Sequence, residues 1–205
     1  MNKTMTTAIA GLLLTVSAQA SAGLIENGSF ESNLLSDNSY KTFQSKKVDG
    51  WSGSKIEIWN NYKGVSAFEG DNFIELNSAD KKDFSIFQSF STAADQQYDF
   101  GFAYAGRTNK NEMFMVEILD DTDSVLFSQT IDDHLRNSWQ VFEATFTATS
   151  DVSTIRFSAD YASTGTLGNF IDGVQVASAQ VPEPASVAVF GASVLLLGAA
   201  RRRQK

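Results

Sequence analysis

The stretch IFQSFSTAADQQYDFGFAYAGR (Ile86–Arg107) decides the fold class of this chain. It holds two runs rich in Phe, Ile and Tyr, IFQSF and YDFGFAYAG, on either side of the polar segment STAADQQ. Such residues are typical of strands, and a polar segment between two such runs is typical of a turn. The stretch therefore predicts two successive β-strands rather than a helix.

The same pattern continues on both sides of this stretch. In KIEIWN (55–60), Ile56 and Ile58 alternate with Lys55 and Glu57, as in a strand with one apolar face. Other short runs, separated by Gly, Asn, Asp or Ser, are NFIELN (72–77), DFSIFQSF (83–90), MFMVEILD (113–120), SVLFSQTI (124–131), WQVFEATFTA (139–148), STIRFSAD (153–160) and NFIDGVQV (169–176). With the 16 phenylalanines of the chain, they predict an all-β, two-sheet antiparallel β-sandwich. Each sheet is expected to have about four or five strands.

A series of motifs along residues 23–180 resembles a known family. In order, they are LIENGSFE (24–31), GWSG (50–53), AFEGDNFIELNS (67–78), the opening stretch, WQVFEATFTATSDVSTIRFSAD (139–160) and GNFIDGVQV (168–176). This order resembles the galactose-binding-like β-jelly roll of carbohydrate-binding modules and of many secreted domains. The resemblance implies a jelly roll over residues 23–180.

The same resemblance implies one structural Ca²⁺ near the junction of the first and last strands, and no required cofactor. Carried over to this sequence, it implies Glu31, Asp71 and Asp172 as ligands, which suits the preference of calcium for oxygen. The alternative is that Asp172 bonds the local backbone. The acidic run Asp120–Asp123 lies between two expected strands and predicts a hairpin turn.

The N-terminus has the pattern of a secretory signal peptide. Lys3 is the only charged residue before Glu26, an apolar run covers Ala8–Val16, and small residues follow in the A-x-A arrangement of a cleavage site. Residues 1–22 are therefore expected to direct export.

Residues 181–205 have three parts: VPEP (181–184), the apolar run Ala185–Ala200 and a basic end. The run is short for a bilayer but predicts a marginal transmembrane helix (185–200) whose basic end faces the cytoplasm. The order resembles the PEP-CTERM sorting signal of Gram-negative bacteria. The sorting and processing motif would comprise Pro182, Glu183, Pro184, Arg201, Arg202 and Arg203.

The PEP-CTERM resemblance implies an exosortase-type membrane enzyme as partner and an anchor in the inner membrane. The final location would be the cell surface or the extracellular matrix, often in bacteria that make exopolysaccharide and biofilms. The alternative is an ordinary C-terminal membrane anchor.

Charge and composition limit the partners of the exported part. Residues 23–183 carry 11 basic and 24 acidic residues, 11 − 24 = −13. This balance argues against binding nucleic acid or anionic lipid, and it is compatible with cations and neutral sugars. The chain has no cysteine, so disulfides and thiolate sites are excluded.

One loop has the residues of a sugar site. WNNYKG (59–64) ends an expected strand, and sugars bind to aromatic rings edged by polar groups. Trp59 and Tyr62 are the predicted platform, with Asn60, Asn61 and Arg107 as polar partners. The alternatives are that an aromatic side chain of this loop folds back on the sheet and that Arg107 pairs with a carboxylate. Trp139 is expected in the core, and Trp51 is expected to be in the core or semi-buried.

No catalytic arrangement stands out. The only histidine, His134, lies in the polar segment TIDDHLRN and is expected to be a solvated loop residue. G-x-S-x-G and H-E-x-x-H are absent. We expect a non-catalytic surface or matrix protein that binds polysaccharide. The alternatives are a structural or adhesive protein that binds other proteins and, third, a glycoside or ester hydrolase.

Overall fold

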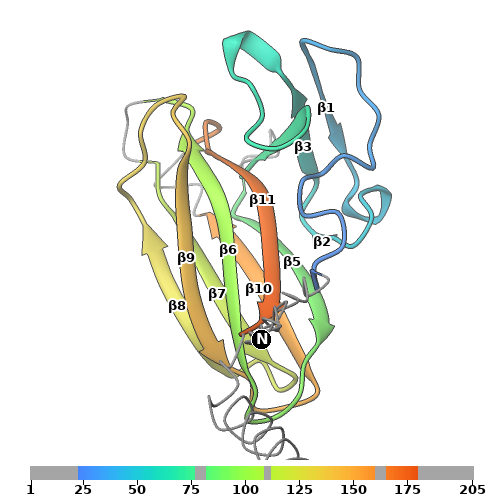
Figure 1. The fold of residues 1–205 in the computed structure, drawn as a ribbon. Coiled ribbons are helices and arrows are strands. Elements are labelled where there is room, and N and C mark those ends of the chain that lie inside the picture. Colours follow the sequence, from blue (N-terminus) through green and yellow to red (C-terminus); the bar gives the residue numbers. More distant parts are fainter. Residues whose placement is uncertain (1–22, 77–81, 109–111, 160–164, 180–205) are drawn as a thin grey trace, which may run out of the picture.

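The computed structural model describes residues 23–76, 82–108, 112–159 and 165–179, which form a two-sheet antiparallel β-sandwich (Figure 1). The expected signal peptide (1–22) and sorting signal (181–205) lie outside the described residues. In the described part of the chain, no helix is long and apolar enough to cross a membrane. The elements are β1 (Ser39–Phe43), η1 (Ser45–Lys47), β2 (Ser52–Gly53), β3 (Ile56–Asn60), η2 (Tyr62–Gly64), β4 (Asn72–Glu75), β5 (Phe84–Ser91), β6 (Gln97–Gly106), β7 (Phe114–Asp120), β8 (Val125–Ile131), β9 (Gln140–Thr147), β10 (Val152–Ala159) and β11 (Asn169–Ser178).

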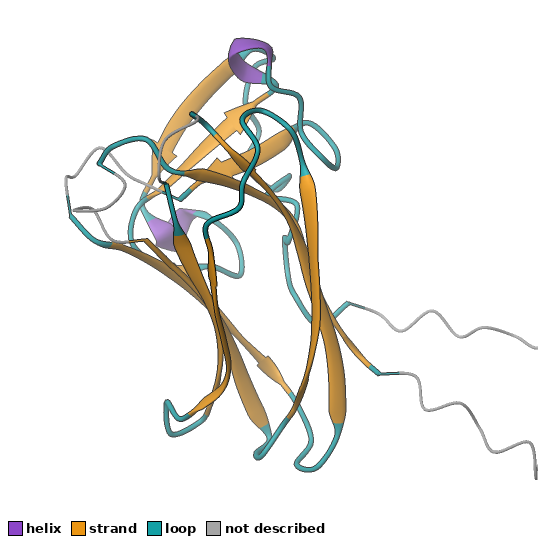
Figure 2. Ribbon diagram, turned by 90° about the vertical axis from the view of Figure 1, so that its left-hand side faces the viewer, coloured by secondary structure: helices purple, strands orange, loops and turns teal. Residues whose placement is uncertain are grey.

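The strands form two layers, seen edge-on in Figure 2. Sheet A has six strands in the order β1-β3-β4-β11-β6-β9, and sheet B has five in the order β2-β5-β10-β7-β8. The nine runs singled out in the sequence are β3 to β11, so the predicted fold class is confirmed. β1 and β2 are additional strands. The predicted hairpin turn after β7 is also confirmed, because Asp120 Oδ1 accepts the N–H groups of Thr122 and Ser124.

The main core lies between the two sheets. Along β5 and β10, every second residue is buried, as the alternation predicts. The largest fully buried rings include Phe30, Phe84, Phe102, Phe114 and Phe157. Trp51 belongs to this core, as predicted, with its ring centroid 5.3 Å from that of Phe30.

A second apolar group, which we call the outer cluster, lies on the outer face of sheet A. Its buried members are Trp59, Val65, Phe73, Ala105 and Phe170, and Tyr62, Ala67 and Trp139 pack against it. Trp139, expected in the core, is partly buried against this outer cluster and not between the sheets. Its ring meets Phe73 edge-on at 5.6 Å, and its indole N–H donates to the Ser66 carbonyl, because the segment between β3 and β4 covers this face.

The described chain begins and ends at the same end of the sandwich. Leu24 N–H donates to the Val176 carbonyl at 2.9 Å, and Val174 N–H donates to the Gly28 carbonyl at 3.0 Å. Gly28 permits this close approach, since a Cβ there would overlap the Val174 carbonyl oxygen. The outer cluster lies toward the other end of β11, whose ten residues span roughly 30 Å.

Candidate functional site

A hollow lined by aromatic rings lies where the outer cluster reaches the edge of sheet A. Tyr40 and Trp59 are cross-strand partners on β1 and β3, and the turn after β3 adds Tyr62. The Tyr62 ring centroid lies 5.0 Å from the centroids of both other rings. This aromatic hollow has a volume of about 210 Å³ and is lined by Tyr40, Glu57, Trp59, Tyr62, Lys63, Arg107, Thr166 and Leu167.

A second hollow adjoins the first. It has a volume of about 370 Å³ and is lined by Trp59, Lys63, Val65, Arg107, Thr108, Arg136, Asn137, Leu167 and Phe170. Three residues of the predicted sugar site, Trp59, Tyr62 and Arg107, therefore lie together, although they come from separate parts of the chain.

Trp59 forms the floor of the aromatic hollow and not an open platform. Only 2% of the residue is exposed, and its indole N–H donates to Glu57 Oε1 at 2.7 Å. The ring most open to solvent is that of Tyr40, which is 51% exposed, while Tyr62 is partly exposed. The alternative of an aromatic side chain that folds back on the sheet thus describes Trp59.

The two asparagines of the predicted site hold the turn and do not line the hollow. The buried Asn60 donates from Nδ2 to Asn72 Oδ1 at 3.0 Å. Asn61 accepts the Ala67 N–H and donates to Asp71 Oδ1. Both side chains therefore fix the segment that covers the outer cluster.

The turn that carries Lys63 has an uncommon backbone conformation. Asn61 and Lys63 have φ values of 43° and 53°, and Gly64 follows at 78°. A left-handed conformation costs a residue with a side chain roughly 1–2 kcal/mol. The Lys63 N–H donates to Asn38 Oδ1, and the Lys63 ammonium lies 5.3 Å from the Tyr62 ring centroid.

Arg107 connects the hollow to a buried carboxyl group. Its Nη1 lies 2.8 Å from both oxygens of Glu75, and its guanidinium carbon lies 4.9 Å from the Trp59 ring centroid. Glu75 is fully buried and also accepts the Gly168 N–H. Burial raises the pKa of Glu75 to about 8, against the opposing effects of Arg107 and the Gly168 N–H. Of the two predictions for Arg107, a polar group of the sugar site or a partner of a carboxylate, the second is confirmed.

The Glu75 carboxyl is expected to make folding stability depend on pH. Its pKa is raised from 4.5 to about 8 in the folded protein, so the folded chain holds the proton more tightly than the unfolded chain. The stabilisation that this bound proton gives the fold is complete below about pH 4.5. It is lost as the pH rises to about 8, and the free energy of unfolding falls by at most about 1.4 kcal/mol per pH unit. Glu75→Gln has no proton to lose, so its melting temperature should fall less steeply across this range. If the melting temperatures of the two proteins differed by the same amount at every pH, the assignment would be contradicted.

Of the three residues proposed as calcium ligands, Asp71 lies in the segment between β3 and β4, and Glu31 and Asp172 bond to that segment. Glu31 Oε1 accepts the N–H groups of Asp71 and Asn72 at 2.8 and 2.7 Å. Asp172 Oδ2 accepts those of Phe68 and Glu69, and burial raises the pKa of Asp172 to about 7.

The observed contacts of the Glu31 and Asp172 carboxylates are with backbone N–H groups. No group of three or more His, Cys, Asp or Glu in the described ranges is arranged to hold a metal. Calcium binding therefore stays a prediction, and the observed role of Glu31 and Asp172 is to fasten this segment to the sandwich.

The expectation of a solvated His134 is wrong. Its side chain is only 4% exposed, and Nε2 lies 2.9 Å from Glu112 Oε2, which is also buried. The loop after β8 bridges to β6 through its backbone, since Gly106 N–H donates to the Leu135 carbonyl, and this places the imidazole against Gly106. His134 thus fastens the loop after β8, and Arg136 of this loop lines the adjoining hollow.

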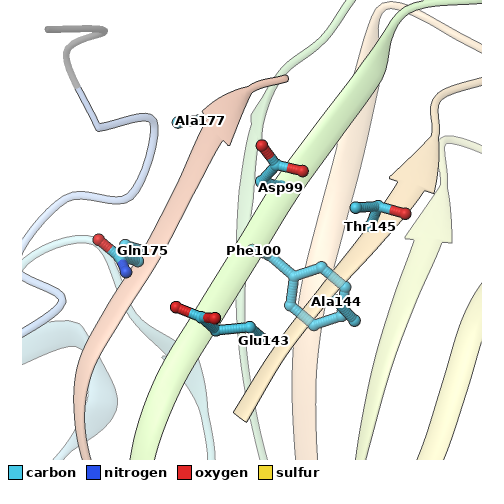
Figure 3. Close-up of a pocket in the computed structure, with 8 residues that line it drawn as sticks. Asp99, Phe100, Glu143, Ala144, Thr145, Gln175 and Ala177 are labelled. Carbon is cyan, nitrogen blue, oxygen red and sulfur yellow. The ribbon is translucent and has the colours of Figure 1, made fainter. Parts of the chain in front are cut away.

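A larger groove lies on the outer face of sheet A, over β11, β6 and the edge strand β9. Figure 3 shows Gln175 from β11, Asp99 from β6 and Glu143 from β9 at this groove, which has a volume of about 450 Å³. Gly101 lies between Gln175 and Glu143 in the strand register and leaves the floor open. Asp99 and Glu143 give the groove two carboxylates, and its one ring, that of Phe100, is buried in the inter-sheet core. Among its described lining residues, the groove therefore has no exposed ring to stack on a sugar.

Residues 23–177 match a family described as "Protein of unknown function (DUF642)". The chain belongs to this family. The match covers nearly all described residues of this DUF642 domain, including the aromatic hollow and the groove. No curated protein matches the DUF642 chain in sequence.

Several solved structures share the fold of this DUF642 domain. TmCBM61 in complex with β-1,4-galactotriose has a TM-score of 0.54 at 17% identity, over 78% of this chain and 100% of that one. Family 16 Carbohydrate Binding Module-2 has a TM-score of 0.52 at 16% identity, over 76% and 99%. An arabinose-bound α-L-arabinofuranosidase, MgGH51, has a TM-score of 0.56 at 12% identity, over 77% of this chain and 26% of the enzyme. The chain thus spans about a quarter of that enzyme. At these identities, the matches establish the β-jelly-roll fold of carbohydrate-binding modules.

Proposed function

We propose that the domain binds carbohydrate in the aromatic hollow. The observation that carries this proposal is the convergence of Tyr40, Trp59 and Tyr62 with Arg107 at one end of sheet A. Exposed rings can stack on the apolar face of a sugar, while charged and polar side chains at the edge bind its hydroxyl groups. The fold shared with TmCBM61, which was solved with a bound galactotriose, supports the same proposal.

The floor of the hollow and the segment that covers the outer cluster are held by contacts within the domain. Trp59 packs on Phe170 with ring centroids 4.9 Å apart, and the bonds of Asn61, Glu31 and Asp172 fix the covering segment. A site that is already ordered loses less conformational entropy on binding. The aromatic hollow therefore suits a ligand bound without rearrangement of the backbone.

Removal of the two accessible rings tests the site. In Tyr40→Ala/Tyr62→Ala, binding of soluble oligosaccharides is expected to weaken by about tenfold to a hundredfold, as for aromatic residues at the centre of an interface. Calorimetry against a panel of oligosaccharides would measure it. The matched control is Asp99→Asn/Glu143→Gln, which alters two side chains of the groove and leaves the hollow intact. If the control lost binding and the tyrosine variant kept it, the groove would be the site instead.

We also propose that the domain is not an enzyme. Glu57 and Glu75 are cross-strand partners beside the hollow, but they are only 8% and 0% exposed. Glu57 is bonded to Trp59 and Thr42, and Glu75 to Arg107 and Gly168. A glycosidase needs two carboxyl groups that reach the scissile bond. Detection of reducing ends after long incubation with a bound polysaccharide, and their absence in Glu57→Gln, would overturn this proposal.

We propose that the protein is exported, held in the inner membrane by residues 181–205 and sorted by an exosortase-type enzyme to the surface or matrix. The geometry of the domain suits this arrangement, because the hollow lies roughly 30 Å along β11 from the end where the terminal segments join. Fractionation of a producer that carries an epitope tag at the exposed turn around Asp121 tests it. A shortened chain in the matrix, together with a full-length membrane-bound Pro182→Ala/Pro184→Ala variant, is the expected result. Full-length membrane-bound chains in both strains would indicate a plain anchor.

A further inference from the structure

The side chains around the two hollows are mostly basic, although the domain as a whole is acidic. Among the described residues that line them, the charged ones are Glu57, Lys63, Arg107 and Arg136. Residues 23–183 as a whole carry 11 basic and 24 acidic residues. Three cations against one carboxylate therefore form a local positive region on an acidic protein.

The single lining carboxylate is already engaged. Both oxygens of Glu57 accept hydrogen bonds, from the Trp59 indole N–H at 2.7 Å and from the Thr42 hydroxyl at 3.4 Å, and the residue is 8% exposed. Two of the cations, by contrast, have no carboxylate within ion-pair distance among the described residues. These are Lys63, which lies over the Tyr62 ring, and the exposed Arg136.

Arg107 is held in place for a ligand as well as for the fold. Its Nη1 is bound to Glu75, while its side chain is 26% exposed and lies over the floor of the hollow. A guanidinium has five N–H donors in a fixed fork, so the buried carboxyl of Glu75 leaves others for a second acceptor.

We propose that the aromatic hollow and the adjoining hollow together select an anionic sugar, one that carries a carboxylate or a sulfate ester. This inference rests on the proposed function. The rings of Tyr40 and Tyr62 would hold the sugar ring, and Lys63, Arg136 and Arg107 would bind its acidic group. Two further carboxyl groups beside the hollows, Glu75 and Glu112, are buried and engaged by Arg107 and His134. Acidic residues beyond about 10 Å are screened at about 0.1 M salt.

Two ligands that differ only in charge provide the test. Oligogalacturonides and the same oligomers as methyl esters present the same ring and linkage, and a sulfated galacto-oligosaccharide separates sulfate from carboxylate. The acid form is expected to bind the full domain about tenfold more tightly than the ester at low salt, which is the size of one charge-assisted hydrogen bond. This preference should shrink in about 0.5 M NaCl.

Charge-removing variants locate the effect. Lys63→Gln/Arg136→Gln is expected to lose most of the preference for the acid while it still binds the ester. Lys46→Gln/Lys47→Gln removes the same charge from residues that line neither hollow, and it should keep the preference. Tighter binding of the sulfated oligomer than of the uronate would assign the site to sulfate esters.

The outcomes separate this inference from the proposed function. Equal binding of acid and ester, or a preference that survives in Lys63→Gln/Arg136→Gln, would overturn the anionic selectivity and leave carbohydrate binding intact. Binding of neutral oligosaccharides alone would do the same. If no oligosaccharide bound, with circular dichroism showing a folded domain, both proposals would fail.

Discussion

Arg107→Ala is expected to cost increasingly more stability as the pH rises above 8, toward about 3–5 kcal/mol, because the buried Glu75 must then either ionise without a counter-charge or keep a proton that the unfolded chain has lost. The wild-type pair joins a carboxyl that is fully buried to a guanidinium at 2.8 Å. Around pH 6 Glu75 is protonated, so the substitution removes only its hydrogen bonds to Arg107 and the contact of Arg107 with Trp59. The cost should then fall to about 1–2 kcal/mol. Urea unfolding at both pH values measures the two costs.

A second variant separates the charge from the shape of the site. Arg107→Ala/Glu75→Gln has no buried charge, so its stability at high pH should exceed that of Arg107→Ala. The side-chain amide introduced by Glu75→Gln still has an oxygen to accept the Gly168 N–H that Glu75 accepts in the wild type. An Arg107→Ala cost that is the same at both pH values would show that the buried charge has no part in it.

The strands could be predicted where one face is buried, and β1 could not. Every second residue of β5 and β10 is buried, and the sequence alternates accordingly. In β1 the three central residues, Tyr40, Lys41 and Thr42, are all exposed, because this edge strand pairs with β3 alone. Without a buried face, its sequence carries no period of two.

The candidate site was only partly predictable for a related reason. The alternation correctly placed Glu57 on the face of β3 that points away from Ile56 and Ile58. It does not predict which segment covers the face that carries Glu57. The segment between β3 and β4 folds over the outer face and buries Trp59, which local sequence does not reveal. Tyr40 was missed because it reaches the hollow through the pairing of β1 with β3, and Arg136 because it depends on the bridge of its loop to β6.

Trp59→Ala is expected to cost about 3–5 kcal/mol, the range for a buried tryptophan, and to abolish carbohydrate binding. The ring is the centre of the outer cluster, with Phe170 at 4.9 Å, Tyr62 at 5.0 Å and Arg107 at 4.9 Å from its centroid. Its loss removes the floor on which Tyr62 and Arg107 rest. Thermal unfolding and calorimetry with oligosaccharides, both on chains shown to be folded at low temperature, measure the two effects.

Trp51→Ala is the matched control, since it deletes an equally buried indole from the core between the sheets. Its stability should fall by a similar amount, while binding persists at a temperature where the domain is folded, because Trp51 lines neither hollow. Trp59→Phe keeps a ring in place but loses the hydrogen bond to Glu57, so it should fold and bind with reduced affinity. Wild-type affinity in a folded Trp59→Ala chain, or equal loss of binding in both alanine variants, would remove the aromatic hollow as the binding site.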